Sequence, residues 1–218
     1  LMELSCITKN IRSVRAHIPA GVTLVCVSKF QPIQAIQEAY QAGERHFGES
    51  RVQELKQKAT QLPNDIQWHF IGHLQTNKVR DILKLKPYII ESVDSKRLLH
   101  AINTEAEKLG IIQNILLEVH VAQEETKSGF TPNDLTTLLS TDICASLPNI
   151  RICGLMSMAT NTEDETEIRR CFSTASSLTS NIQHPTSDII LSMGMSDDYK
   201  IAMEYGSNSV RIGSSIFG

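Results

Sequence analysis

The residue with the clearest chemical potential is Lys29, which ends an unbroken apolar run near the start of the chain. The run from Leu24 to Ser28 lies between Gly21 and Pro32, a pattern typical of a short parallel strand buried on both faces. In an α/β barrel the carboxyl ends of the strands form the mouth at which chemistry takes place, so a lysine there faces ligand. An amine at an apolar rim loses hydration and becomes a nucleophile able to form a Schiff base with an aldehyde. The alternative is a lysine that ends a strand and extends into water.

Two stretches near the carboxyl terminus have the composition of a phosphate site. Gly194 and Ser196 follow one expected strand, and Gly213 and Ser214 follow the next. A glycine lets the backbone approach a ligand, the hydroxyls donate hydrogen bonds, and a helix amino terminus favours an anion. Arg211 shares a strand face with Gly213, where its guanidinium can add directional hydrogen bonds. The alternative is that these residues only cap a helix and turn the chain.

A reactive amine and a phosphate socket at one barrel opening indicate a ligand with an aldehyde at one end and a phosphate at the other. The loops after the seventh and eighth strands are the usual phosphate seat of an α/β barrel, and Lys29 lies across the same mouth. Pyridoxal 5′-phosphate (PLP) is the expected ligand, and a phosphorylated sugar aldehyde is the alternative.

The elements that must position these residues alternate between strand and helix at intervals of about 25 residues, which requires right-handed βαβ crossovers and a parallel sheet. The expected strands lie at about 24–28, 45–49, 66–71, 88–92, 115–119, 150–156, 188–192 and 209–212. Eight such units predict a (β/α)8 TIM barrel, with a helix over about 3–17 in the place of the one missing after the last strand. An open, doubly wound sheet is the structural alternative.

The composition limits the class of protein. The chain has 218 residues, of which 41% are hydrophobic and 21% charged, and a formal net charge of −3, as in ordinary soluble globular proteins. No linker, low-complexity tract or charge block divides it, so we expect one domain over 1–218. The charge gives no basic footprint for nucleic acid, and no apolar run approaches the roughly 18 residues that span a membrane.

The expected compartment is the cytoplasm. The beginning of the chain lacks the basic start and apolar block of a signal peptide. Five widely spaced cysteines without a CxxC pair indicate buried free thiols in a reducing environment.

Taken in order, a series of motifs along nearly the whole chain resembles the pyridoxal phosphate homeostasis proteins, a cytosolic group related to the barrel domain of alanine racemase. The motifs are Val27-Ser28-Lys29, Phe47-Gly48-Glu49, Trp68-His69-Phe70-Ile71-Gly72, Leu74-Gln75-Thr76-Asn77-Lys78, Lys127-Ser128-Gly129, Gly154-Leu155-Met156, Ser192-Met193-Gly194-Met195-Ser196 and Arg211-Ile212-Gly213. The resemblance implies a single TIM barrel of the alanine racemase N-terminal type.

The resemblance also implies roles for single residues. Lys29 would bind PLP covalently, and Ser196, Gly213 and Ser214 would hold its phosphate together with the Gly194 turn.

Around the cofactor ring the resemblance implies further contacts. Arg211 would lie beside the phosphate or the pyridine nitrogen, where a permanently charged guanidinium makes the ring a weak electron sink. Met156 would touch the ring, and His69 would pack under or beside it. Ser50 stands where the family pattern has an asparagine, and a serine is shorter and has no amide, which puts direct contact with the ring substituents in doubt.

Two other features have simpler interpretations. His69 and His73 flank a strand end, but no carboxylate cluster accompanies them at ligand spacing, so we expect no metal. We expect Lys78 to lie at a solvated helix start rather than in a second site.

The alternatives for function are a carrier and an enzyme. Related racemases need a second acid–base group and a lid from an additional domain, and this chain stops at Gly218 directly after the eighth strand. We therefore expect a monomeric protein that binds, buffers or delivers PLP to apoenzymes, with no turnover of its own. One alternative is a PLP-dependent racemase or lyase in which Tyr199 or Tyr205 reaches the ring, and another is a Schiff-base aldolase that acts on a sugar phosphate.

Overall fold

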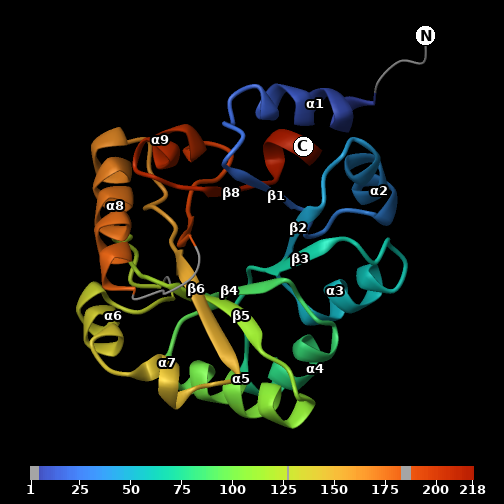
Figure 1. Ribbon diagram of the computed structural model, residues 1–218. Coiled ribbons are helices and arrows are strands. Elements are labelled where there is room, and N and C mark those ends of the chain that lie inside the picture. Colours follow the sequence, from blue (N-terminus) through green and yellow to red (C-terminus); the bar gives the residue numbers. More distant parts are fainter. Residues whose placement is uncertain (1–4, 127, 183–187) are drawn as a thin grey trace.

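Eight parallel strands close into a barrel in a computed structural model that describes residues 5–126, 128–182 and 188–218 (Figure 1). The strands are β1 (Thr23–Val27), β2 (His46–Glu49), β3 (Gln67–Phe70), β4 (Ile89–Val93), β5 (Gln113–Glu118), β6 (Ile150–Met156), β7 (Ile190–Ser192) and β8 (Ser209–Ile212). Each strand pairs with the next, and β8 pairs with β1. The predicted (β/α)8 barrel is thus confirmed, and the open-sheet alternative is wrong.

Helices surround the barrel as an outer ring (Figure 1). They are α1 (Cys6–Arg15), α2 (Ile33–Gln41), α3 (Val52–Ala59), α4 (Val79–Lys84), α5 (Lys96–Leu109), α6 (Pro132–Leu139), α7 (Ile143–Ser146), α8 (Glu165–Leu178), α9 (Tyr199–Glu204) and α10 (Ser214–Phe217), with the 3-10 turns η1 (Thr76–Lys78) and η2 (Thr179–Asn181). No helix within the described ranges is long and apolar enough to cross a membrane.

Local sequence signals set several of these boundaries. The Ser95 hydroxyl accepts a hydrogen bond from the Leu98 N–H at the start of α5, and Gly110 ends that helix in the left-handed conformation with a φ of 65°. The Thr131 hydroxyl caps α6 in the same way by accepting from the Asp134 N–H. Short capping side chains and one glycine therefore fix where these helices begin and end.

The first helix lies beside the end of the chain, as predicted (Figure 1). Asn10 on α1 donates a hydrogen bond of 2.9 Å to the Ile216 carbonyl on α10. The sequence analysis missed α10, which is only one turn long and has little helical periodicity to detect. The described part of α1 is also shorter than predicted, because the Ser5 hydroxyl caps it just before Cys6.

Apolar side chains form two separate cores. The larger core lies between the strands and the outer helices, and it includes Leu24, Phe47 and Phe172. A smaller cluster consists of Ile89, Leu116 and Met156, from β4, β5 and β6.

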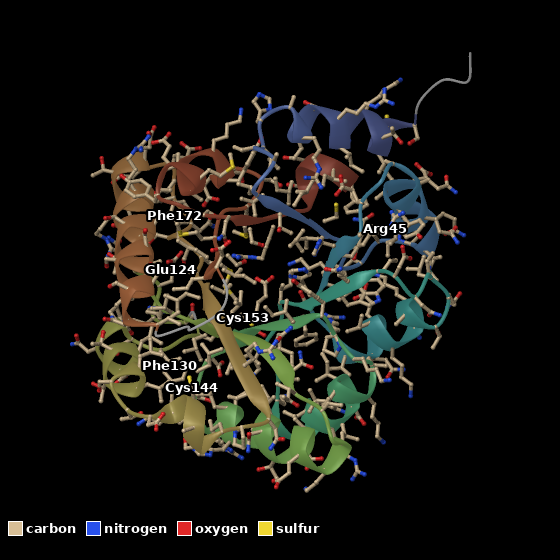
Figure 2. All side chains as sticks on the ribbon, in the orientation of Figure 1. Arg45, Glu124, Phe130, Cys144, Cys153 and Phe172 are labelled. Atoms are coloured by element: carbon tan, nitrogen blue, oxygen red, sulfur yellow. The ribbon has the colours of Figure 1, made fainter. Side chains whose placement is uncertain are left out.

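The cysteines differ from the prediction of five buried thiols. All five are free, but only Cys26 and Cys171 are buried, whereas Cys6 and Cys144 are exposed and Cys153 is intermediate. Figure 2 shows Cys144 on the outer helix α7 and Cys153 on the sheet. Apolar neighbours in the sequence do not bury a cysteine when the short helix that carries it lies on the surface.

Candidate functional site

The register of β1 with β8 brings Lys29 and Gly213 to the same rim. Cys26 on β1 pairs with Ile212 on β8, so the residues that follow the two strands leave the barrel side by side. A Cβ atom at Gly213 would lie 3.3 Å from the Val27 Cβ, which confirms how closely the two chain segments approach. Lys29 lies in the turn two residues beyond Val27, and it is exposed.

The loop after β7 contacts the segment on both sides of Gly213. The Arg211 N–H donates a hydrogen bond of 2.9 Å to the Gly194 carbonyl, and the Ser215 N–H donates one of 3.3 Å to the Ser196 hydroxyl. Gly194 has a φ of 98°, and a Cβ there would lie 2.7 Å from the Ala202 Cβ, so only glycine fits without strain. The two glycine turns predicted to form one phosphate socket therefore lie next to each other.

Arg211 lies inside the barrel, where only 4% of its surface is exposed. Its guanidinium donates to the Ser192 hydroxyl at 2.6 Å and to the Ser157 carbonyl at 2.9 Å. The same guanidinium lies 3.9 Å from the Glu91 carboxylate, which balances its charge in the interior. Because β4 and β8 are not neighbours in the barrel, this contact crosses the interior.

Glu91 continues the polar chain towards the other end of the barrel. One of its oxygens accepts a hydrogen bond of 2.6 Å from Ser192, and the other lies 2.5 Å from His69 Nδ1. Burial acts to raise the pKa of Glu91, but the hydrogen bond and charge of His69 and the charge of Arg211 outweigh it and hold that pKa below the ordinary value. His69 Nε2 in turn lies 2.9 Å from His46 Nδ1.

His46 is the outermost member of this chain, on the first residue of β2. Burial and the neighbouring His69 lower the pKa of His46 to about 4, so its ring is neutral at physiological pH. Arg211 and His46 are thus joined by an unbroken series of polar contacts through Ser192, Glu91 and His69.

The comparisons with known proteins decide the family. The profile of the alanine racemase N-terminal domain matches residues 2–218. The pyridoxal phosphate homeostasis protein of Schizosaccharomyces pombe is 40% identical over 201 residues, which cover 91% of this chain and 84% of that protein. The protein of the same name from Helicobacter pylori strain 26695 is 41% identical over 204 residues, which cover 93% and 89%. The chain belongs to the pyridoxal phosphate homeostasis protein family.

Solved structures agree with this assignment. The family member PipY of Synechococcus elongatus, solved with PLP bound, is 34% identical and superposes with a TM-score of 0.85, covering 97% of this chain and 100% of that one. Alanine racemase from Streptomyces coelicolor is only 17% identical and shows the fold alone, with a TM-score of 0.82 over 99% of this chain and 58% of the racemase. The family and the barrel type predicted from the sequence are both confirmed.

A buried lysine that the sequence analysis missed supports the Lys29 turn of this family member. Lys58 on α3 is buried, and its ammonium donates hydrogen bonds of 2.7 Å to the Ser28 carbonyl and to the carboxylates of Glu49 and Glu54. Because Ser28 directly precedes Lys29, the ammonium of Lys58 fixes the end of β1.

The residue after Lys29 is held by Glu54, one of the two carboxylates that Lys58 contacts. Glu54 accepts a hydrogen bond of 2.6 Å from the Phe30 N–H, and Phe30 has a left-handed φ of 64°. The Ser28 hydroxyl donates to Glu49 at 2.6 Å. Burial raises the pKa of Glu49, although the hydrogen bonds from Lys58 and Ser28 oppose the shift. The residues before and after Lys29 are therefore both tied to α3.

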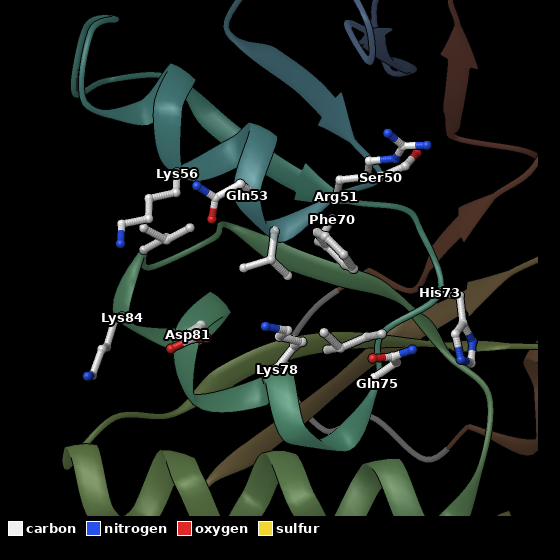
Figure 3. Close-up of a pocket in the computed structure, with 13 residues that line it drawn as sticks. Ser50, Arg51, Gln53, Lys56, Phe70, His73, Gln75, Lys78, Asp81 and Lys84 are labelled. Carbon is white, nitrogen blue, oxygen red and sulfur yellow. The ribbon is translucent and has the colours of Figure 1, made fainter.

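The remaining predicted site residues lie in different surroundings. Met156 is buried against Ile89 and Leu116 in the smaller apolar cluster. His69 contacts Glu91 and His46 in the polar chain described above. Ser50 follows β2 and lines a cavity between α3 and α4 (Figure 3). Among the described residues no group of His, Cys, Asp and Glu side chains could hold a metal ion.

Proposed function

We propose that this chain binds PLP covalently through Lys29 and holds, buffers or delivers it without turning over a substrate. Its curated relatives carry the name pyridoxal phosphate homeostasis protein, and PipY has been solved with PLP bound. The observation that carries the proposal is the pairing of β1 with β8, which sets Lys29 and the Gly213–Ser214 turn just beyond the ends of two neighbouring strands, at one rim.

The residues at this rim fit an aldehyde that carries a phosphate. Gly194 and Gly213 have no side chains, so a ligand can approach the backbone at these two adjoining turns. Ser196 and Ser214 supply hydroxyl groups at the same turns. When bound, PLP supplies an aldehyde that condenses with a primary amine, and the exposed amine of Lys29 is the candidate. Lys58 holds the Ser28 carbonyl before Lys29, and Glu54 holds the Phe30 N–H after it. These contacts reduce the freedom of the turn, which favours one orientation for bond formation.

Arg211 is the candidate neighbour of the pyridine ring. Its guanidinium is held by Ser192 and Ser157 in the barrel interior. A guanidinium does not release its proton, so a pyridine nitrogen beside it stays unprotonated and the ring withdraws electrons weakly. This arrangement supports binding rather than turnover.

The tyrosines that a racemase would need belong to the packing of α9. Tyr199 is 7% exposed and packs in the main core, and Tyr205 packs against that core. Burial raises the pKa of Tyr199, which makes its phenol a poorer acid at neutral pH. Both features support the carrier function over a racemase.

Borohydride reduction of the PLP-treated protein followed by peptide mapping tests the covalent part of the proposal. We expect a pyridoxyl adduct on Lys29, and loss of the adduct and of visible absorbance in Lys29→Ala. Lys96→Ala changes an exposed lysine at the start of α5 and serves as the matched control. An adduct on another lysine in the wild-type protein, with none on Lys29, would overturn the proposal.

Solvent deuterium exchange separates a carrier from an enzyme. We expect no exchange at the α-carbon of added amino acids above the level of free PLP. Exchange that requires Lys29 would instead establish a racemase-type or lyase-type activity.

We further propose that the protein acts as a cytoplasmic monomer and that its recipients are apoenzymes that use PLP. Reactivation of such an apoenzyme by the loaded protein, compared with an equal concentration of free PLP, tests the delivery. Sedimentation of the loaded protein tests the monomer.

A further inference from the structure

A cavity of about 450 Å³ lies between α3 and α4 (Figure 3), and neither Gly213 nor Ser214 lines it. It is lined by Ser50, Arg51, Val52, Gln53, Lys56, Phe70, His73, Leu74, Gln75, Lys78, Asp81, Lys84 and Leu85. Phe70 and Leu74 are nearly fully buried and form an apolar base, whereas most of the polar members are exposed. A volume of this size is in the range of small-molecule binding sites.

Positive charge is concentrated around the cavity. Its lining contains the cations Arg51, Lys56, Lys78 and Lys84, and the single carboxylate Asp81. None of these four cations forms an ion pair with an acidic side chain within 5–126, 128–182 and 188–218. In a chain with a formal net charge of −3, such a group of unpaired cations creates a local positive potential that attracts anions.

The backbone adds to this potential. The first turn of α3 lines the cavity, and its N-cap residue, Arg51, makes no side-chain hydrogen bond to the free N–H groups of that turn. Glu54, the acidic residue of the same turn, is directed towards Lys58 and the Phe30 N–H. Residues of the first turn of α3 therefore line the cavity, and the carboxylate of that turn is engaged elsewhere.

The cavity also gathers a sequence motif that has no part in the expected PLP contacts. Leu74, Gln75 and Lys78 belong to the Leu74–Lys78 motif, and they line the cavity together with Ser50. Lys78 is exposed at the start of α4, as expected, but it also lines this cavity, which the sequence analysis did not anticipate. Ser50 replaces the asparagine of the family pattern with a shorter side chain. The Ser50 carbonyl lies so close to Gly72 that a Cβ atom at Gly72 would overlap the carbonyl oxygen. This close packing fixes the wall of the cavity.

We propose that this cavity is a second binding site, for a small molecule that carries at least two phosphate charges. Lys56 and Lys84 lie on one side of the cavity and Lys78 lies below it (Figure 3). Rotation of these exposed side chains would let a multiply charged anion contact several cations. The apolar base formed by Phe70 and Leu74 accommodates an uncharged part of the molecule. Lys29 is not among the residues that line this cavity.

Calorimetric titration of the protein with inorganic pyrophosphate, at low ionic strength, tests the site. We expect saturable binding that weakens as salt is added, because exposed charges are screened. The double variant Lys78→Gln, Lys84→Gln should raise the Kd for pyrophosphate by at least tenfold. Both lysines are exposed, so the variant should unfold at the wild-type temperature. Lys96→Gln, on an exposed lysine outside the cavity, should bind as the wild type does.

A second variant distinguishes this cavity from the proposed PLP phosphate socket. Ser196→Ala, Ser214→Ala should leave the pyrophosphate Kd within twofold of wild type. Loss of binding in that variant, with full binding retained in Lys78→Gln, Lys84→Gln, would assign the anion to the PLP socket and overturn the proposal. Binding of a poly-glutamate peptide in the cavity without binding of pyrophosphate would overturn it as well, because the occupant would then be a protein segment.

Discussion

The ammonium of Lys58 lies 2.7 Å from the Glu49 carboxylate, and both side chains are almost closed to solvent. Among the described residues the other oxygen of Glu49 has no hydrogen-bond partner. Lys58 is therefore the counter-ion of this buried carboxylate, and the Ser28 hydroxyl donates a further hydrogen bond to it. Since the same ammonium holds the Ser28 carbonyl, the ion pair connects α3 to the last residue before Lys29. Its removal should therefore affect both the stability of the barrel and the geometry of the Lys29 turn.

Lys58→Met should lower the free energy of unfolding by about 3 to 5 kcal/mol, because it leaves the Glu49 carboxylate buried without a counter-ion. Urea denaturation at pH 7 measures the change. The control Lys56→Met alters an exposed lysine on the same helix and should change stability by less than about 0.5 kcal/mol. Equal stability of the two variants would show that water replaces Lys58 without cost.

The same variant tests whether Lys58 positions Lys29. The fraction of Lys58→Met that forms the pyridoxyl adduct should be lower than in the wild type even under conditions in which the variant is folded. Lys58→Arg should recover part of the lost adduct yield. A purely structural role would leave the adduct yield of the folded fraction unchanged.

Three glycine substitutions should give graded losses of stability. Gly21→Ala meets open space and should be nearly neutral, and Gly43→Ala meets open space but has a φ of 108°, which costs about 1 kcal/mol. Gly194→Ala combines a φ of 98° with contacts of 2.7 Å to Ala202 and Tyr199, so the loss should reach about 2 to 4 kcal/mol. Thermal denaturation measures the order of the three stability losses. A Gly194→Ala variant as stable as the wild type would contradict the close packing of the Gly194 turn.

The neutral ring of His46 should make the protein less stable in mild acid. Its pKa is about 4 when folded and near 6.5 in the unfolded chain, so between these values only the unfolded chain binds the proton. Stability is therefore present above pH 6.5 and is lost as the pH falls towards 4. The ring is partly open to water, so we expect a loss of about 1 to 2 kcal/mol after allowing for screening.

Urea denaturation of the wild type and of His46→Gln at several pH values between 7 and 4.5 checks this expectation. The variant should show a flatter dependence over that range. His17→Gln, on an exposed histidine, should keep the wild-type slope. Identical slopes in all three proteins would show that His46 titrates normally.

The barrel and the rim were predictable because they depend on patterns close together in the chain. Apolar runs between helical periods predicted the strands, and the glycine turns after β7 and β8 predicted one socket at the mouth that holds Lys29. The expected position of Lys29 across the mouth was wrong, because β1 pairs with β8 and sets Lys29 beside the Gly213 turn. The partners of Glu91 were not predictable. A carboxylate within the apolar run of β4 is a visible signal, but Ser192 and Arg211 are over a hundred residues away and meet it only when the barrel closes.

Lys58 escaped prediction for a different reason. Its spacing from Glu54 is that of a solvent-exposed ion pair on a helix. Its burial arises from the packing of α3 on β1 and β2, where Ser28 and Glu49 supply the other oxygens. Periodicity within a helix carries no information about such a contact.

Replacement of Arg211 by lysine should separate its charge from its geometry. A lysine keeps the positive charge near Glu91 but cannot donate to the Ser192 hydroxyl and the Ser157 carbonyl in the same fork. We expect a loss of about 1 to 3 kcal/mol in unfolding free energy, because at least one buried acceptor loses its partner.

Under the proposed function, the visible absorbance of the PLP-loaded Arg211→Lys variant should also shift towards that of a protonated pyridine, since an ammonium can release a proton where a guanidinium does not. Urea denaturation and absorbance titration from pH 6 to 9 measure the two effects, with Arg151→Lys, on an exposed arginine of β6, as the control. A stability loss with an unchanged spectrum would place Arg211 away from the ring and limit it to holding the interior of the barrel.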